Sequence, residues 1–148
     1  MSGPKPIVVG VDGSEAAQRA LDRALDEALL RGCGVRAVRA WVFEPLGLTA
    51  LAALREAEHW AAVELAKAVA AVVGGRSETP PIEQVSAEGG PAEVLIRHSE
   101  DAALLVVASH RGERLRKAVL GSVSTACARR STVPVVVLPA GVNAPRVS

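Results

Sequence analysis

Five short apolar runs, separated by segments with helical spacing, constrain the fold of this chain more than any other feature. Between the runs, apolar residues recur every three or four positions, as at Ala17, Leu21 and Ala24. We therefore predict strands at residues 7–11, 35–42, 82–87, 103–108 and 135–138 and helices at about 17–29, 49–73, 91–99 and 122–130. Alternating strands and helices predict one α/β domain, a parallel sheet with helices on both faces. We expect this domain to span residues 1–148, with its core at about 6–139 and a loosely ordered tail at 140–148.

Composition limits which classes of partner the chain is expected to bind and in which compartment it is expected to lie. Hydrophobic residues make up 49% of the chain and aromatic residues only 2%, so Val, Leu, Ile and Ala must fill the core, which suits buried parallel strands. The formal net charge of +1 favours neither a nucleic acid nor a membrane as partner. We find neither a signal peptide nor an apolar stretch of about 20 residues, and we expect a cytoplasmic protein. Cys33 and Cys127 are then expected to be reduced, small apolar residues.

The strongest local signal is Gly121–Ser122–Val123–Ser124 at the head of a predicted helix. In parallel sheets, ligands bind at the carboxyl ends of the strands, where the strand order reverses. A helix start presents free N–H groups and the positive end of the helix dipole, which attract phosphate. Ser122 and Ser124 would add hydroxyl donors. The alternative is that Ser122 simply caps its helix.

Asp12 follows the first predicted strand, but it does not belong to a dinucleotide fingerprint, because the third glycine of GxGxxG is missing. Its carboxylate would repel a phosphate and would suit a ribose hydroxyl or an adenine donor. Alternatively, Asp12 and Glu15 have the spacing of a capping box. The basic residues before the Gly121 segment either contact phosphate or are solvated; they are His110, Arg111, Arg114, Arg116 and Lys117.

Other chemistry finds little support in the sequence. The three histidines have no metal-ligand spacing with one another or with the cysteines. A Cys127 nucleophile with His110 as base is far less expected than a buried apolar Cys127. Neither a GxSxG elbow nor a Walker motif is present. We therefore expect no metal and no catalytic residue, and we leave slow ATP hydrolysis open.

Taken in chain order, these segments resemble the universal stress protein family. The resemblance covers about residues 6–139 and is carried by residues 7–14 (IVVGVDGS), 90–92 (GPA), 104–107 (LLVV), 121–124 (GSVS) and 133–137 (VPVVV). It implies an adenine-nucleotide alpha-hydrolase-like fold with the strand order 3-2-1-4-5. It also implies a homodimer through the last strand, Val135–Leu138, whose apolar edge invites a partner strand.

The resemblance also implies a nucleotide site. Adenosine would lie against Val11, Asp12, Ala40 and Trp41. Members that bind ATP carry G-x2-G-x9-G-[ST]; here Gly121 and Ser122 match the last two positions, whereas Ala108 and Arg111 occupy the first two. A glycine occurs one place later, at Gly112.

Three hypotheses follow from this altered glycine pattern. The first is a signalling or stress-response module that binds ATP or AMP, with or without Mg²⁺, in which Arg111 clamps phosphate. The second is a nucleotide-free dimer, in which Arg111 blocks the loop. The third is a slow hydrolase of ATP or another small ester.

Overall fold

The structure is a computed structural model that describes residues 3–43, 50–109 and 121–139 of the chain. The predicted alternation of strands and helices is confirmed, with ends that differ by a few residues at most. The basic residues between 110 and 117, Gly112 and the tail at 140–148 lie outside the described residues. In chain order the elements are β1 (Ile7–Gly10), α1 (Glu15–Arg31), β2 (Val35–Trp41), α2 (Ala50–Val73), β3 (Ile82–Glu88), α3 (Pro91–His98), β4 (Leu104–Ala108), α4 (Ser122–Arg130) and β5 (Val135–Leu138).

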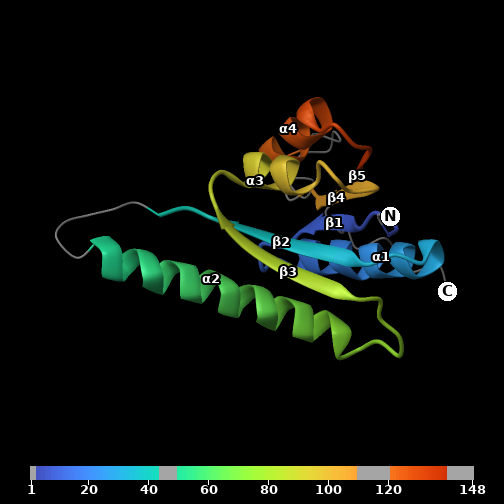
Figure 1. Cartoon of the computed structure of the whole chain (residues 1–148), viewed down its shortest axis with the longest axis horizontal. Coiled ribbons are helices and arrows are strands. Elements are labelled where there is room, and N and C mark those ends of the chain that lie inside the picture. The colour runs from blue at the N-terminus through green and yellow to red at the C-terminus, as the bar shows by residue number, and fades with distance from the viewer. Residues whose placement is uncertain (1–2, 44–49, 110–120, 140–148) are drawn as a thin grey trace.

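The five strands form one parallel sheet in the order β3-β2-β1-β4-β5 (Figure 1), as expected. The register aligns Gly10 of β1 with Val38 of β2, while Val9 lies opposite Val106 of β4. The chain winds from β1 toward one edge and then returns to place β4 on the other side of β1. The order therefore reverses between β1 and β4, and the carboxyl ends of β1, β2 and β4 meet there.

Helices cover both faces of the sheet, as predicted, and each face has its own core (Figure 1). On one face, α1 packs on β1 and β4, and α2 packs on β2 and β3, through buried side chains such as Leu21, Leu25 and Leu65. On the other face, α3 and α4 pack on the sheet around a second set of buried side chains, which includes Leu105 of β4 and Val94 of α3. Each fully buried side chain of this kind contributes about 1.5–3 kcal/mol relative to its exposed state, so both layers stabilise the sheet.

The two cysteines lie in different cores, and both are buried and free, as predicted. Cys33 belongs to the core between the sheet and the pair α1 and α2. Cys127, on α4, belongs to the core on the opposite face. Burial raises the pKa of the Cys127 thiol, which keeps it in the unreactive protonated form.

The start of α1 differs from one of the alternatives raised by the sequence. Ser14 is the N-cap, and its Oγ accepts a hydrogen bond of 3.1 Å from the Ala17 N–H. The capping-box hypothesis for Asp12 and Glu15 is therefore wrong, because Asp12 lies two residues before the cap. Its Oδ1 instead accepts hydrogen bonds from the Ser14 N–H and from the Ser14 hydroxyl, at 3.0 and 2.6 Å. The side chain thus shapes the turn rather than capping the helix.

A polar cluster around Arg36 ties together the amino-terminal end of the sheet. The Arg36 guanidinium donates to Glu83 on β3 at 2.6 Å and to Asp101 at 2.8 Å. It also donates to the His98 carbonyl at the end of α3, at 2.8 Å. This bonding holds the pKa of Asp101 below its usual value. Burial, and then the charges of Arg97 and Arg36, lower the pKa of His98.

Within the described ranges, the helices all lack the combination of length and apolar character that a membrane crossing requires.

Candidate functional site

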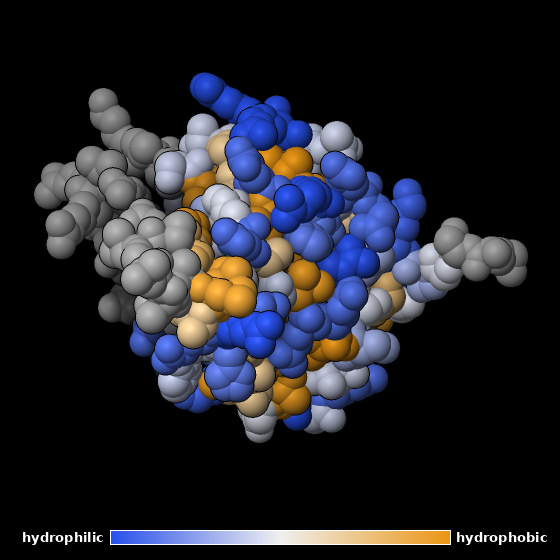
Figure 2. Space-filling view, turned by 60° about the vertical axis from the view of Figure 1, so that its left-hand side comes forward, coloured by the Kyte–Doolittle hydropathy of each residue, from blue (hydrophilic) through white to orange (hydrophobic). Residues whose placement is uncertain are grey.

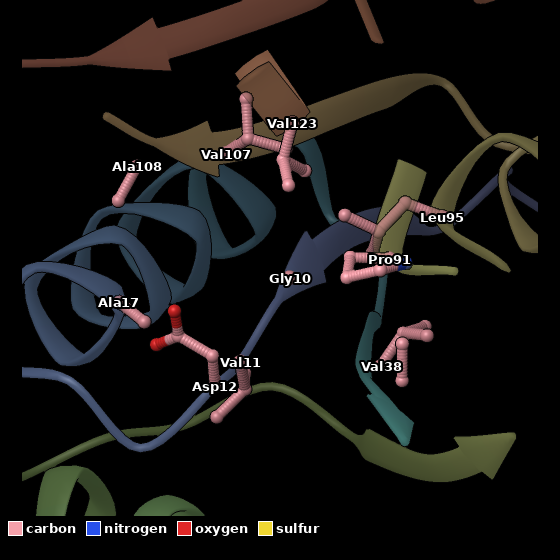
Figure 3. Close-up of a pocket in the computed structure, with 11 residues that line it drawn as sticks. Gly10, Val11, Asp12, Ala17, Val38, Pro91, Leu95, Val107, Ala108 and Val123 are labelled. Carbon is pink, nitrogen blue, oxygen red and sulfur yellow. The ribbon is translucent and has the colours of Figure 1, made fainter. Parts of the chain in front are cut away.

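A pocket lies at the point where the strand order reverses, as the predicted topology requires (Figure 3). Its cavity has a volume of about 120 Å³. The carboxyl ends of three strands form its floor, and the first turns of α1, α3 and α4 contribute its walls. Its lining residues are Gly10, Val11, Asp12, Ala17, Val38, Ala40, Pro91, Leu95, Val107, Ala108 and Val123.

Among the described residues, the lining is almost entirely apolar, and Asp12 is the single charged residue in it. Figure 3 shows the Asp12 carboxylate on the side of Ala17, apart from the apolar wall formed by Pro91 and Leu95. A cavity of this kind offers apolar surface to a flat ring and one strong acceptor to a hydroxyl or amino donor. Five of the predicted site residues, Val11, Asp12, Ala40, Ala108 and Val123, are brought together here.

The helix start at Gly121 lies beside this pocket, since Val123 lines it. Gly121 is the N-cap of α4, and Ser122 is the first helical residue, exposed and not a cap. The alternative that Ser122 caps the helix is therefore wrong. The backbone of Gly121 has φ −63° and ψ 167°, which any residue can adopt. What this glycine provides is the absence of a side chain next to the N–H groups of the first turn.

Ser124 has a different environment from Ser122. Its side chain is buried, and its hydroxyl donates a hydrogen bond of 3.2 Å to the carbonyl of Ala108. This bond ties the first turn of α4 to the end of β4, which also lines the pocket. The Ser124 hydroxyl hydrogen is therefore already engaged, whereas the Ser122 side chain faces solvent. A role in binding stays a prediction for both serines.

The predicted pair Ala40 and Trp41 is divided between the two faces of the sheet. Consecutive strand residues point to opposite sides, and only Ala40 lines the pocket. The Trp41 carbonyl accepts a hydrogen bond of 2.9 Å from the Gly89 N–H, which fixes the turn before α3.

Sequence reasoning missed six of the lining residues. Pro91 belongs to the GPA segment that was noted, and its position at the start of α3 was the available signal. Leu95 lies one turn later, where a β-carbon on Gly10 would approach its Cδ1 to 3.0 Å. The missed residues are Gly10, Ala17, Val38, Pro91, Leu95 and Val107.

Arg39 was also missed, although it lies behind the turn that carries Asp12. A β-carbon on Gly13 would come within 3.3 Å of the Arg39 Nη1. In the described part of the chain, this nitrogen, the Trp41 Nε1 and the Ser86 Oγ are buried without a hydrogen-bond partner. Arg39 and Ser86 are register partners, so these three polar side chains lie on one face near the ends of β2 and β3. Of the three, Arg39 places a positive charge close to the Asp12 turn.

The described residues contain no group of three or more side chains suited to hold a metal ion. Cys127 is fully buried and keeps its proton, so its environment is not that of a nucleophile.

Comparisons with known proteins agree with this geometry. The model of the universal stress protein family matches residues 3–139. The universal stress protein Rv2005c of Mycobacterium tuberculosis is 38% identical over 138 residues, which are 89% of this chain and 44% of the relative. The chain thus spans less than half the length of the curated relatives it matches.

Solved structures show the same fold. A universal stress protein in complex with cAMP has a TM-score of 0.68 and 25% identity, covering 93% of this chain and 98% of the other. The protein UspA from Lactobacillus plantarum has a TM-score of 0.71 at 20% identity, covering 93% and 99%. With a family match over nearly all of its length, this chain belongs to the universal stress protein family.

Proposed function

We propose that this chain is a signalling or stress-response module that binds an adenine nucleotide, ATP or AMP. The observation that carries the proposal is the apolar pocket with one carboxylate, located where the strand order reverses and beside the start of α4. The structure with cAMP bound, which is 25% identical to this chain, supports the same ligand class.

The parts of the pocket suit the parts of a nucleotide. In our proposal the adenine ring packs against the apolar wall that includes Leu95 and Val38. The ribose hydroxyls donate to Asp12, which accepts well and would repel a phosphate. The phosphate lies at the first turn of α4, where backbone N–H groups and the helix dipole favour an anion.

The module is proposed to bind its ligand without transforming it. Fast hydrolysis requires a positioned base or nucleophile. Among the lining residues that the structure describes, Asp12 is the one titratable side chain, and its turn is already shaped by hydrogen bonds from Ser14. Release of phosphate from excess ATP should therefore be slow.

We also propose a homodimer through β5. Within the described residues, β5 pairs with β4 alone, so its other edge presents backbone groups to a partner strand. Its apolar Val136 is 39% exposed, as expected of a strand that another copy covers.

Calorimetry with ATP, AMP and cAMP, with and without Mg²⁺, tests the nucleotide proposal. Micromolar binding of ATP corresponds to about −8 kcal/mol. Gly121→Val should abolish phosphate-dependent binding, because its side chain would cover the first N–H groups of α4. Gly75→Val, at the far end of α2, is the matched control and should leave the affinity unchanged.

Two results would redirect the proposal. If Gly121→Val bound ATP as tightly as the unmodified protein, the phosphate position would be wrong. If none of the three nucleotides bound, the nucleotide-free dimer would replace the module as the better account. Its sequence basis would be the altered glycine pattern, in which Ala108 and Arg111 occupy the first two family glycine positions.

A further inference from the structure

Helix α2 is longer than the sheet on which it packs. Its 24 residues extend about 36 Å at 1.5 Å per residue, whereas the seven residues of β3 span about 23 Å. The difference, about 13 Å or nine residues, projects past the carboxyl ends of β2 and β3 (Figure 1). Burial agrees, because residues 51–60 are exposed or half-buried and Ala61 is the first buried residue of the helix. We call residues 51–60 the overhang.

The stripe with which α2 faces the core continues along the overhang. The buried positions of α2 begin at Ala61 and Leu65. At about 100° per residue, Leu54 and Ala57 lie on the same stripe and Leu51 lies at its border. Leu51 is nevertheless 65% exposed. Figure 2, which turns this end of the molecule toward the viewer, shows apolar residues exposed among hydrophilic ones.

The overhang carries opposite charges at this stripe. Arg55 flanks it on one side, whereas Glu58, one turn later, falls within it at about 60° from Ala61, and both are exposed. Within the described residues, neither takes part in an ion pair. If two overhangs meet antiparallel about a two-fold axis near Leu54 and Ala57, the Arg55 of each copy comes within side-chain reach of the Glu58 of the other. The surface is therefore complementary to itself, as a two-fold contact requires.

We propose that the overhang docks against the overhang of a second copy of this chain as an antiparallel helix pair. The Leu51 and Leu54 side chains pack across the axis, and two Arg55–Glu58 pairs flank them. About nine residues from each copy bury less surface than the 1,200–2,000 Å² of a standard interface. The contact is therefore weak and depends on concentration.

This contact is separate from the proposed β5 dimer. Helix α2 packs on β2 and β3, at the opposite edge of the sheet from β5. The two contacts can therefore form together, with the overhangs joining β5 dimers into larger assemblies. The overhang proposal does not depend on nucleotide binding, and either proposal can fail without the other.

Thiol crosslinking tests the contact. Leu54→Cys, treated with a short bifunctional thiol reagent, should give crosslinked dimers whose yield rises with protein concentration. The matched control is Leu30→Cys on α1, because Leu30 is a leucine that is 83% exposed and lies off the overhang. The native cysteines are buried and should react slowly. Ala57→Cys provides a second crosslinking position if the first variant folds poorly.

A charge swap identifies the partner surface. In the Leu54→Cys background, Arg55→Glu should weaken the contact by at least about tenfold, which is a change of about 1.4 kcal/mol. Adding Glu58→Arg to Arg55→Glu should restore the yield, because opposite charges then face each other again with their positions exchanged. Val135→Pro, which removes a donor from the free edge of β5 because residues 134 and 138 direct their backbone groups at β4, should leave this crosslink intact.

Three outcomes would overturn the proposal. Equal yields at Leu54→Cys and Leu30→Cys would show random collision. A charge swap that fails to restore the yield would show that the two helices do not meet in this orientation. Loss of the crosslink in Val135→Pro would assign the dimer to β5 alone.

Discussion

Replacing Gly10 with alanine tests the packing that forms one wall of the pocket. Gly10 ends β1, and its φ is not in the left-handed region, so the backbone accepts alanine. A β-carbon there would come 3.0 Å from Leu95 Cδ1 and 3.3 Å from Cδ2. Carbon atoms pack best at about 3.5–4.0 Å, so Leu95 must move by a few tenths of an ångström or more.

Two effects oppose each other in this variant. Alanine in a strand gains about 0.5–1 kcal/mol over glycine, because the unfolded chain loses freedom. Overpacking a core typically costs about 1–3 kcal/mol. Leu95 is only 5% exposed, so it cannot turn away without displacing its neighbours. We expect overpacking to prevail, with a net loss of about 1 kcal/mol in the free energy of unfolding.

Urea denaturation of Gly10→Ala, Leu95→Ala and the double variant measures the contact directly. Leu95→Ala alone should cost about 2–5 kcal/mol. In the double variant the new methyl group enters the space that Leu95 leaves, so its loss should be smaller than the sum by about 1–2 kcal/mol. If the two losses instead add to within about 0.5 kcal/mol, the two residues do not compete for space and the reasoning fails.

Three further predictions concern the polar cluster around Arg36 and one of the two cores. Arg36→Met should lower the free energy of unfolding by about 1–2 kcal/mol, because it removes the hydrogen bonds to Asp101, Glu83 and the His98 carbonyl. The control Arg31→Met, which breaks an exposed ion pair within α1, should cost at most about 0.5 kcal/mol. Equal losses of the two variants in urea denaturation would contradict this ranking. The lowered pKa of His98 means that the unfolded chain binds the proton more readily than the folded chain, so stability should fall as the pH drops below about 6.5. Between pH 8 and 5 the urea midpoint should therefore fall less in His98→Gln than in the unmodified protein. If the pH dependence were the same in both, His98 would not be its source. Leu21→Ala should cost about 2–5 kcal/mol without changing AMP affinity by calorimetry, because Leu21 lies in the core and does not itself line the pocket. A large loss of affinity would show that this core is coupled to the pocket.

The architecture could be predicted from sequence because it depends on local patterns. Apolar runs bounded by turns marked the strands, and Gly32 ended α1 in the left-handed conformation at φ 68°, as its position predicted. The start of α4 at Gly121 was recognised in the same way. The pocket followed from the strand order, which the family resemblance implied, and Asp12 was found because it directly follows the strand predicted at residues 7–11.

The details that sequence reasoning missed depend on contacts between distant segments. Which of Ala40 and Trp41 lines the pocket is set by the face that β2 turns toward α3, and a shift of one residue reverses it. Asp12 and Ser14 are both good caps, and only the geometry of the turn selects Ser14. The approach of Leu95 to Gly10 joins α3 to β1 across more than half the chain, and no local pattern indicates it.

Because each core contains one cysteine, the labelling rates of the two native thiols can measure local opening on each face of the sheet. A buried thiol reacts with a small reagent only when its surroundings open, so its labelling rate measures the stability of that region. Cys33 monitors the layer of α1 and α2, and Cys127 the layer of α3 and α4. Two of the three helices that line the pocket, α3 and α4, belong to the layer of Cys127, and only α1 belongs to the layer of Cys33. A ligand bound there should therefore slow the labelling of Cys127 more than that of Cys33. The two rates would then show, without any engineered probe, on which side of the sheet a ligand acts.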